Sequence, residues 1–157
     1  MSDAGGPAID ATTVKVINRT GYPEPYRAAV AGRSWRALGD AFGLTHFGVN
    51  LVRLAPGAAS SQRHWHSKED ELVYVLSGTP VLITDAGEQA LAPGMVVGFK
   101  AGATDGHHLV NRTGEDVVFL AIGDRVDDDE CDYPDVDMLA RVIDGQSRYT
   151  RKDGTPY

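Results

Sequence analysis

The chain has 157 residues, of which 42% are hydrophobic and 24% are charged, so it is long enough to bury one sizeable core in a single folded domain. It contains no apolar run of about 18 residues and no basic and apolar leader at the N-terminus, so neither membrane insertion nor secretion is signalled. We therefore expect a cytoplasmic protein with no membrane partner. The lone Cys131 excludes an internal disulfide and a cysteine-rich zinc site.

The formal net charge of −7 is concentrated in residues 124–137, which carry eight acids against one arginine. This segment lacks the glycine of a calcium-binding EF-hand loop and is interrupted by Pro134, so a solvated acidic surface is the favoured interpretation. No basic patch with interleaved aromatic residues occurs in the sequence. Nucleic-acid binding would lack its usual electrostatic driving force, and we expect no nucleic-acid partner.

Residues 1–13 are small, polar and rich in glycine, and they predict a flexible N-terminal arm ahead of one domain at residues 14–157. Short apolar segments closed by Gly, Asn or Asp then recur along the chain. The predicted strands cover residues 14–17, 47–54, 71–78, 80–85, 88–94, 95–102, 107–111 and 116–123. Between Tyr26 and Leu44 the pattern is ambiguous. This rhythm predicts an all-β sandwich or barrel.

One short helix is predicted near the C-terminus. In DVDMLARVI, residues 135–143, apolar side chains recur at helical spacing and Asp135 can serve as the N-cap. The polar residues 147–157 predict a segment that wraps the surface or an adjacent subunit. Because proteins usually cover the exposed edges of their sheets, we expect a homodimer in which the N-terminal arm or an edge strand pairs with a second copy.

The segment HWHSKEDELVYVLSG places two histidines one residue apart. Side chains alternate along a strand, so His64 and His66 face the same way. Glu71 begins the next predicted strand, where its carboxylate can meet the histidine pair across a hairpin. This juxtaposition predicts an inward-facing polar cluster.

A third imidazole comes from the segment HHLVN, in which His107 and His108 face opposite sides of the strand. Only one of them can join an inward-facing site, and alternation alone leaves open which one. Three neutral histidines and one carboxylate suit divalent iron, manganese, nickel, cobalt or zinc, and they leave one or two coordination positions open. We therefore expect one divalent transition metal as the cofactor.

Residues 57–78 closely resemble the first conserved motif of the cupin superfamily, and residues 94–111 resemble the second. With the strands on either side, the resemblance covers most of the chain. It implies the double-stranded β-helix, or jelly-roll barrel, of a small single-domain cupin. It also implies that the metal ligands are His64, His66, Glu71 and His107. His107 is preferred to His108 because its spacing to Asn111 matches the family, and Asn111 is expected to support the ligands.

The flanking segments look like those of small bacterial cupins grouped as sugar-phosphate-isomerase-like. The resemblance implies a metal-dependent enzyme acting on a small polar molecule, with the metal polarising a carbonyl and hydroxyl pair while a base moves a proton between adjacent carbons. One alternative is a non-haem iron dioxygenase that uses the same four ligands. Another is a non-enzymatic module that binds or senses a small molecule, because this fold serves many functions.

Substrate contacts are predicted on and beside the motif strands. Cationic anchors for a phosphate and one polar group aimed into the barrel are expected to come from Arg53, Arg63, Lys100 and Asn50. Tyr74 and His108 have the chemistry of an acid or base, but strand alternation places both on the face opposite the ligands. They are therefore expected to pack or to lie at an interface.

Overall fold

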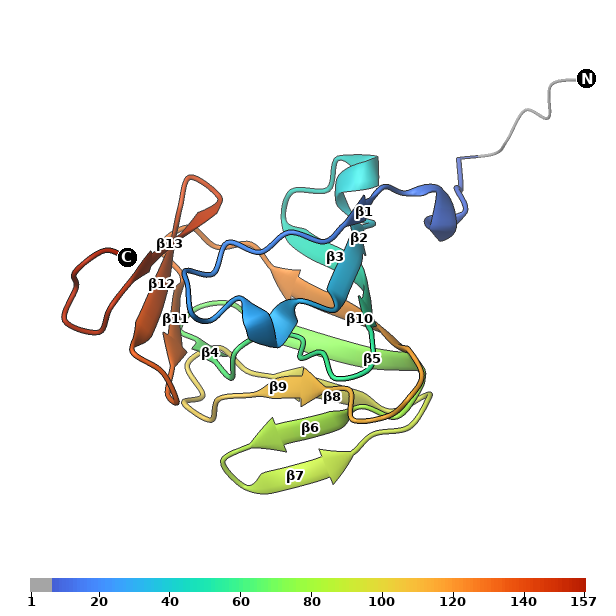
Figure 1. Cartoon of the computed structure of the whole chain (residues 1–157). Coiled ribbons are helices and arrows are strands. Elements are labelled where there is room, and N and C mark those ends of the chain that lie inside the picture. Colours follow the sequence, from blue (N-terminus) through green and yellow to red (C-terminus); the bar gives the residue numbers. More distant parts are fainter. Residues whose placement is uncertain (1–6) are drawn as a thin grey trace, which may run out of the picture.

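The computed structural model describes residues 7–157, and nearly all of its regular structure is strand (Figure 1). Among these residues, the helical elements are three short 3-10 helices, Ala11–Thr13, Ala28–Val30 and Asp40–Phe42. Within the same range, no helix is long and apolar enough to cross a membrane. Part of the predicted N-terminal arm, residues 1–6, lies outside the described residues.

A six-stranded antiparallel sheet forms one wall of the barrel, in the order β1-β2-β3-β10-β5-β8. Its strands are β1 (Val16–Ile17), β2 (Arg33–Ala37), β3 (Phe47–Leu54), β5 (Glu71–Ser77), β8 (Val96–Phe99) and β10 (Val117–Asp124). The three long strands β3, β5 and β10 follow the predicted segments closely. The ambiguous stretch contains β2, which pairs with β3.

Two smaller sheets build the opposite wall, in the orders β7-β6-β9 and β13-β12-β11-β4. Their strands are β4 (Trp65–His66), β6 (Val81–Thr84), β7 (Gly87–Ala90), β9 (His108–Val110), β11 (Glu130–Tyr133), β12 (Met138–Ile143) and β13 (Gln146–Thr150). An antiparallel bridge between His64 and His107 joins the two sheets. Figure 1 shows β11, β12 and β13 together at one end of the molecule.

The core lies between the walls because strand side chains alternate. In β5, Val73 and Val75 are buried, whereas Leu72 and Tyr74 face outward and are exposed. Phe119 of β10 is fully buried beside them. Burying a side chain of this kind contributes about 1.5–3 kcal/mol to stability. A second core cluster underlies the C-terminal strands and contains Tyr22, Val30, Cys131, Tyr133, Met138 and Ala140.

The turn after β5 requires glycine. Gly78 has a φ of 78°, in the left-handed region that side chains avoid. A Cβ at this position would lie 2.8 Å from the backbone oxygen of Asp116 and 2.8 Å from a methyl group of Val117. The glycine that closes the first cupin-like motif is therefore explained by both backbone conformation and close packing.

The predicted C-terminal helix is wrong, because residues 138–143 form β12, which pairs with β11 on one side and β13 on the other. Asp144 and Gly145 have φ values of 51° and 71°, and Ile143 pairs with Gln146 across this two-residue turn. An Asp-Gly pair with positive φ at both positions is typical of a tight β-hairpin. The hydrogen bonds of the hairpin and of its partner strand therefore favour a strand here, despite the helical spacing of the apolar residues.

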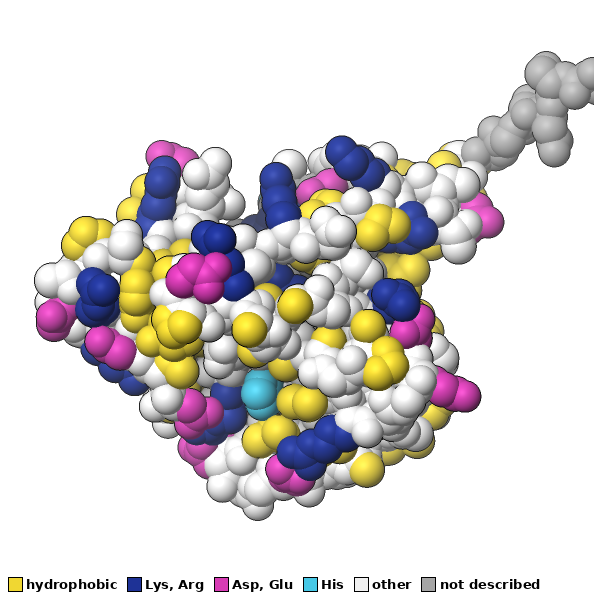
Figure 2. Space-filling view, viewed as in Figure 1, with side chains coloured by type: hydrophobic (Ala, Val, Ile, Leu, Met, Phe, Trp, Pro, Cys, Tyr) yellow, Lys and Arg dark blue, Asp and Glu magenta, His cyan; other side chains and the backbone are white. Residues whose placement is uncertain are grey.

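Charged side chains of both signs are interspersed over the face shown in Figure 2. Ion pairs join exposed side chains of the molecule, for example Arg112 with Glu88 and Arg53 with Asp116. Exposed pairs of this kind contribute little to stability, typically about 0–1 kcal/mol. On this face, basic and acidic groups therefore offset one another.

Candidate metal centre

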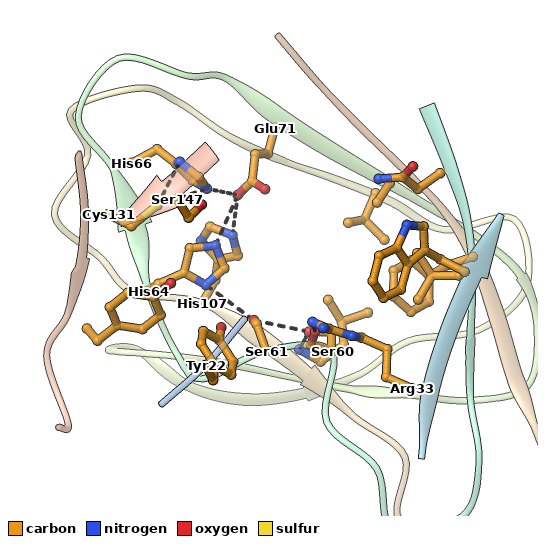
Figure 3. Close-up of a pocket in the computed structure, with 18 residues that line it drawn as sticks. Tyr22, Arg33, Ser60, Ser61, His64, His66, Glu71, His107, Cys131 and Ser147 are labelled. Atoms are coloured by element: carbon orange, nitrogen blue, oxygen red, sulfur yellow. Dashed lines mark hydrogen bonds and ion pairs between the residues drawn. The ribbon is translucent and has the colours of Figure 1, made fainter. Parts of the chain in front are cut away.

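Three imidazole rings direct their Nε2 atoms toward one carboxylate oxygen inside the barrel (Figure 3). The distance to Oε2 of Glu71 is 2.7 Å for His107, 3.3 Å for His66 and 3.7 Å for His64. Glu71 begins β5 in one wall, and the three histidines belong to the opposite wall. The fold therefore brings together the four side chains that the sequence singles out as ligands.

Hydrogen bonds on the far side of two rings orient their Nε2 atoms. Nδ1 of His64 lies 2.9 Å from the backbone oxygen of Gln62, and Nδ1 of His66 lies 2.6 Å from Oδ2 of Asp129. Since both partners are acceptors, the neutral form of each ring keeps its proton on Nδ1 and turns the Nε2 lone pair toward the centre. This is the usual way in which proteins orient metal-binding histidines.

The electrostatics of the cluster favour a cation at its centre. Burial raises the pKa of Glu71, but the hydrogen bond with His107 and the nearby imidazoles of His64 and His66 outweigh this effect and hold the pKa well below its usual range. Burial likewise lowers the pKa of His66, yet its contacts with Cys131 and Glu71 raise the pKa to about 12. Glu71 is therefore a carboxylate at neutral pH, and its field attracts positive charge.

His107 has the environment of a neutral ligand. Its ring is buried and stacks on Phe99, with centroids 3.5 Å apart and planes 3° from parallel. Burial lowers the pKa of His107 and so favours the uncharged imidazole. The adjacent His108 faces away from the centre, and its Nδ1 lies 2.9 Å from the backbone oxygen of Ser61. The structure thus places His107, and not His108, at the centre.

Asp129 is the functional candidate that the sequence pattern missed. It belongs to the segment interpreted as a solvated acidic surface, but it is fully buried. Besides His66, its carboxylate accepts hydrogen bonds from the amides of Lys68 and Glu69, at 2.7 and 3.2 Å. No local signal distinguishes Asp129 from its acidic neighbours, because the pairing of β11 with β4 is what buries it.

Asn111 lies elsewhere than expected. Its side-chain amide donates to the backbone oxygens of Leu54 and Glu115, at 2.9 and 2.7 Å, and its carbonyl oxygen accepts from Thr113. These contacts hold the turn after β9 and involve none of the four candidate ligands. Asn111 therefore stabilises the barrel at a distance, and Asp129 takes the supporting position at the centre.

A cavity of about 450 Å³ opens beside the candidate ligands. Apolar side chains of the barrel core line part of it, including Val52, Val73 and Phe119, and the phenols of Tyr22 and Tyr133 add polar groups. Its other polar lining includes Arg33, Asn50, Ser60, Ser61 and Ser147. Asn50 thus lines the cavity as the sequence predicts, whereas Arg33 was not singled out because it belongs to the ambiguous stretch.

The two predicted arginine anchors lie outside this cavity. Nε of Arg53 lies 2.5 Å from Asp116 on the outer surface. Arg63 makes two hydrogen bonds to Asp135, at 2.8 and 2.9 Å, and a further one to Asp85. These ion pairs join separate loops, and a substrate role for either arginine stays a prediction that no contact supports.

Lys100 lines a second cavity, of about 370 Å³, on another side of the centre. This cavity also borders His66, Glu71 and His107, so the candidate ligands lie between the two spaces. Thr84 and Asp105 contribute polar groups to its wall. Lys100 is therefore near the centre, although it faces a different space from Asn50.

Comparison with known proteins gives the same architecture. The sequence model of the family described as Cupin domain matches residues 50–123, which include all four candidate ligands. A search of curated proteins gives no match. A crystal structure of a cupin-superfamily sugar phosphate isomerase from Silicibacter pomeroyi is 44% identical, with 96% of each chain covered and a TM-score of 0.92.

Two other solved structures extend the comparison. A protein from Acidithiobacillus ferrooxidans, provisionally named a sugar phosphate isomerase, is 36% identical over 81% of this chain and 82% of that chain, with a TM-score of 0.73. The polyketide cyclase RemF from Streptomyces resistomycificus is 21% identical over 76% of this chain and 80% of that chain, with a TM-score of 0.63, and it shares the fold alone. The family match and the extent of the first similarity show that the chain belongs to the cupin superfamily.

Proposed function

We propose that this cupin holds one divalent transition metal through His64, His66, Glu71 and His107. The observation that carries the proposal is the convergence of three Nε2 atoms on one carboxylate oxygen, with the Nδ1 atoms of His64 and His66 facing acceptors. Three nitrogens and one oxygen suit iron, manganese, nickel, cobalt or zinc. Four protein ligands leave one or two positions for a substrate on a five- or six-coordinate ion.

The reaction that we propose is a sugar-phosphate-isomerase-like conversion of a small polar molecule. Its support is the similarity to the Silicibacter pomeroyi protein and a cavity of about 450 Å³ that borders the four ligands. When bound, the metal supplies a Lewis acid that polarises a carbonyl and hydroxyl pair. The chain itself supplies the enclosed space, the orientation of the substrate and hydrogen-bond donors.

Two phenols in the cavity are suited to donating hydrogen bonds. Burial raises the pKa of Tyr22 to about 12 and raises the pKa of Tyr133 well above its usual range. Both hydroxyls therefore keep their protons at neutral pH. Together with the amide of Asn50, which also lines the cavity, they can bind the oxygens of a polyhydroxylated substrate.

Metal analysis followed by a substrate screen tests this function. Protein purified without an affinity tag should contain close to one equivalent of a transition metal, and nuclear magnetic resonance should show interconversion of aldose and ketose phosphates. His64→Ala should lose both metal and turnover. Oxygen uptake with a chelating substrate would instead support the dioxygenase, and ligand-induced thermal stabilisation without turnover would support a binding module. Either result would contradict the isomerase.

We also propose that the protein acts as a homodimer. The outer face of the six-stranded sheet exposes apolar side chains that a monomer would leave in water: Leu72, Tyr74, Leu76 and Val96. Exposed apolar patches of this kind often mark protein interfaces. Light scattering at micromolar concentration should give twice the mass of one chain, and a monomer mass alone would contradict the proposal.

A further inference from the structure

We propose that Arg33 binds an anionic group, a phosphate or a carboxylate, on the molecule that enters the cavity beside the four ligands. The inference deepens the proposed function, on which it rests for the identity of the cavity as the substrate site. It assigns the ligand one anionic end at Arg33 and an oxygen-rich end at the metal centre. Figure 3 shows Arg33 and Ser60 across the cavity from His66 and Glu71.

The guanidinium of Arg33 is held in place from two sides. Nη1 donates to the backbone oxygen of Ser60 at 2.7 Å, and the guanidinium carbon lies 5.1 Å from the centroid of the Trp35 ring. Arg33 and Trp35 lie two residues apart on the same face of β2, where they pair with Leu54 and Val52 of β3. A guanidinium group fixed in this way loses little conformational freedom when it binds an anion.

The charge of Arg33 has no counter-charge among residues 7–157. Carboxylates lie within 4 Å of six other arginines, namely Arg27, Arg53, Arg63, Arg112, Arg125 and Arg141. No such ion pair involves Arg33 in the described part of the chain. Burial lowers the pKa of Arg33, but a guanidinium stays charged at neutral pH. A cation that is partly removed from water without a partner is costly, and a bound anion offsets that cost.

The guanidinium of Arg33 keeps donors that no group of the protein satisfies. Nε of Arg33 is buried and finds no acceptor in residues 7–157, and within the same range Nη2 makes no hydrogen bond. Because Nε is enclosed, an anion in the cavity is bound by the charge of the guanidinium and by its outer N–H groups. This charge favours an oxyanion over a neutral sugar hydroxyl at this position.

The volume and the lining residues of the cavity indicate a small ligand with polar groups. Apolar side chains such as Val52 and Phe119 line the cavity together with the polar groups of Arg33 and the candidate ligands. A volume of about 450 Å³ suits a compact metabolite and excludes a polymer as a fully enclosed ligand. The ligand we infer is a small phosphorylated or carboxylated molecule with oxygen atoms at the end opposite to its anionic group.

Isothermal titration with inorganic phosphate and with acetate, as probes of the two anion classes, tests the inference. Wild-type protein is titrated in its metal-loaded form and after removal of metal with EDTA, beside Arg33→Gln and the control Arg112→Gln. We expect Arg33→Gln to weaken binding of the preferred anion by about tenfold or more, because a charge-assisted bond is lost. Arg112→Gln should bind within about twofold of wild type, because Arg112 lies on the outer surface, paired with Glu88.

The two metal states separate this inference from the proposed function. If Arg33 is the anchor, the anion binds to the EDTA-treated wild type as well, whether or not the metal-loaded protein turns over a sugar phosphate. Anion binding that needs metal, or that survives Arg33→Gln unchanged, overturns the inference. If the metal-loaded wild type shows no isomerase turnover while the anion still binds and Arg33→Gln still weakens that binding, the proposed reaction is wrong and the inference stands.

Chemical modification of the wild type covers the case in which Arg33→Gln folds poorly. Phenylglyoxal modifies arginine side chains, and peptide mass spectrometry identifies each modified position. The preferred anion should slow the modification of Arg33 several-fold and leave that of the surface residue Arg112 unchanged. Equal rates at Arg33 with and without both anions would overturn the proposal.

Discussion

The two cupin-like motifs and the C-terminal sheet contribute different parts of the same centre. The motifs, residues 57–78 and 94–111, supply all four candidate ligands from segments whose strand pattern and glycines are visible in the sequence. The C-terminal strands β11, β12 and β13 supply none of the four candidate ligands, yet Asp129 just before β11 holds His66 by a 2.6 Å hydrogen bond. Ligand identity is therefore local in this chain, whereas ligand orientation depends on a distant segment.

This division follows from where each interaction is encoded. Alternation along a strand decides which histidine faces inward, and a spacing of two residues is enough to place His64 and His66 together. The partner of His66 comes from 63 residues further along the chain and reaches it only because Cys131 of β11 pairs with His66 of β4. We therefore expect substitutions of the candidate ligands in the motifs to remove the metal and substitutions of Asp129 to weaken metal binding.

Replacing a candidate ligand should have the largest effect. His66→Ala removes an imidazole whose Nε2 lies 3.3 Å from Oε2 of Glu71, so we expect metal content near zero and a lower melting temperature. The control His108→Ala changes a histidine that faces away from the centre and should keep near-normal metal content. Mass-spectrometric metal analysis measures both. An empty site in His108→Ala would show that the wrong histidine has been placed at the centre.

The next largest effect is expected at Asp129. Asp129→Asn keeps the shape of the side chain but removes the negative charge of the carboxylate that accepts a hydrogen bond from Nδ1 of His66. Metal affinity should therefore fall by about 10–100-fold. The matched control is Asp127→Asn, two residues earlier on an exposed position. Competition with a chelating dye measures the affinity. Equal affinity in both variants would mean that the C-terminal sheet does not tune the centre.

Much of the fold is readable from the sequence because its strands carry their own pattern. The predicted segments 47–54 and 71–78 correspond to β3 and β5 almost residue for residue. The helix predicted at 135–143 fails because apolar spacing there fits either a helix or a strand, and pairing with β11 and β13 decides between them. The spacing of apolar residues along the sequence carries no information about this pairing between strands.

The candidate site divides in a similar way. His107 is distinguished from His108 by strand alternation and motif spacing, which are local. Arg33 escapes prediction because β2 is a polar strand whose place in the barrel depends on pairing with β3. Asp129 escapes because a buried acid in a run of acids has the same local sequence as an exposed one.

A smaller effect is expected from the turn that decides between helix and strand. Gly145→Ala places a Cβ on a residue with a φ of 71°, which should cost about 1–2 kcal/mol in the free energy of unfolding. A Cβ at this position would meet no atom within 4 Å, so backbone strain alone is tested. Gly114→Ala is the control, since its surroundings are equally open and its φ is not left-handed. Urea unfolding measures both, and equal stabilities would contradict the hairpin.

The smallest effect concerns the ion pair that ties the C-terminal segment to the motif strands. Asp135 accepts two hydrogen bonds from Arg63, and these bonds hold the pKa of Asp135 below its usual range. A carboxylate with a lowered pKa adds stability above its unfolded-state pKa of about 3.9, and this stability is lost as the pH falls through the lower folded-state value. Because Asp135 is largely exposed, we expect Asp135→Asn to cost about 0.5–1 kcal/mol at pH 7.

Urea unfolding of wild type and Asp135→Asn between pH 3 and pH 7 measures this difference. The gap in stability should stay constant from pH 7 down to about pH 4 and shrink below that, because protonation of Asp135 in the wild type removes the same charge that the mutation removes. Asp127→Asn, which alters an exposed acid nearby, should show no such gap at any pH. A gap that widens on acidification would have the wrong sign for a carboxylate stabilised by Arg63. It would mean that Arg63 does not stabilise the ionised form of Asp135 in the folded protein.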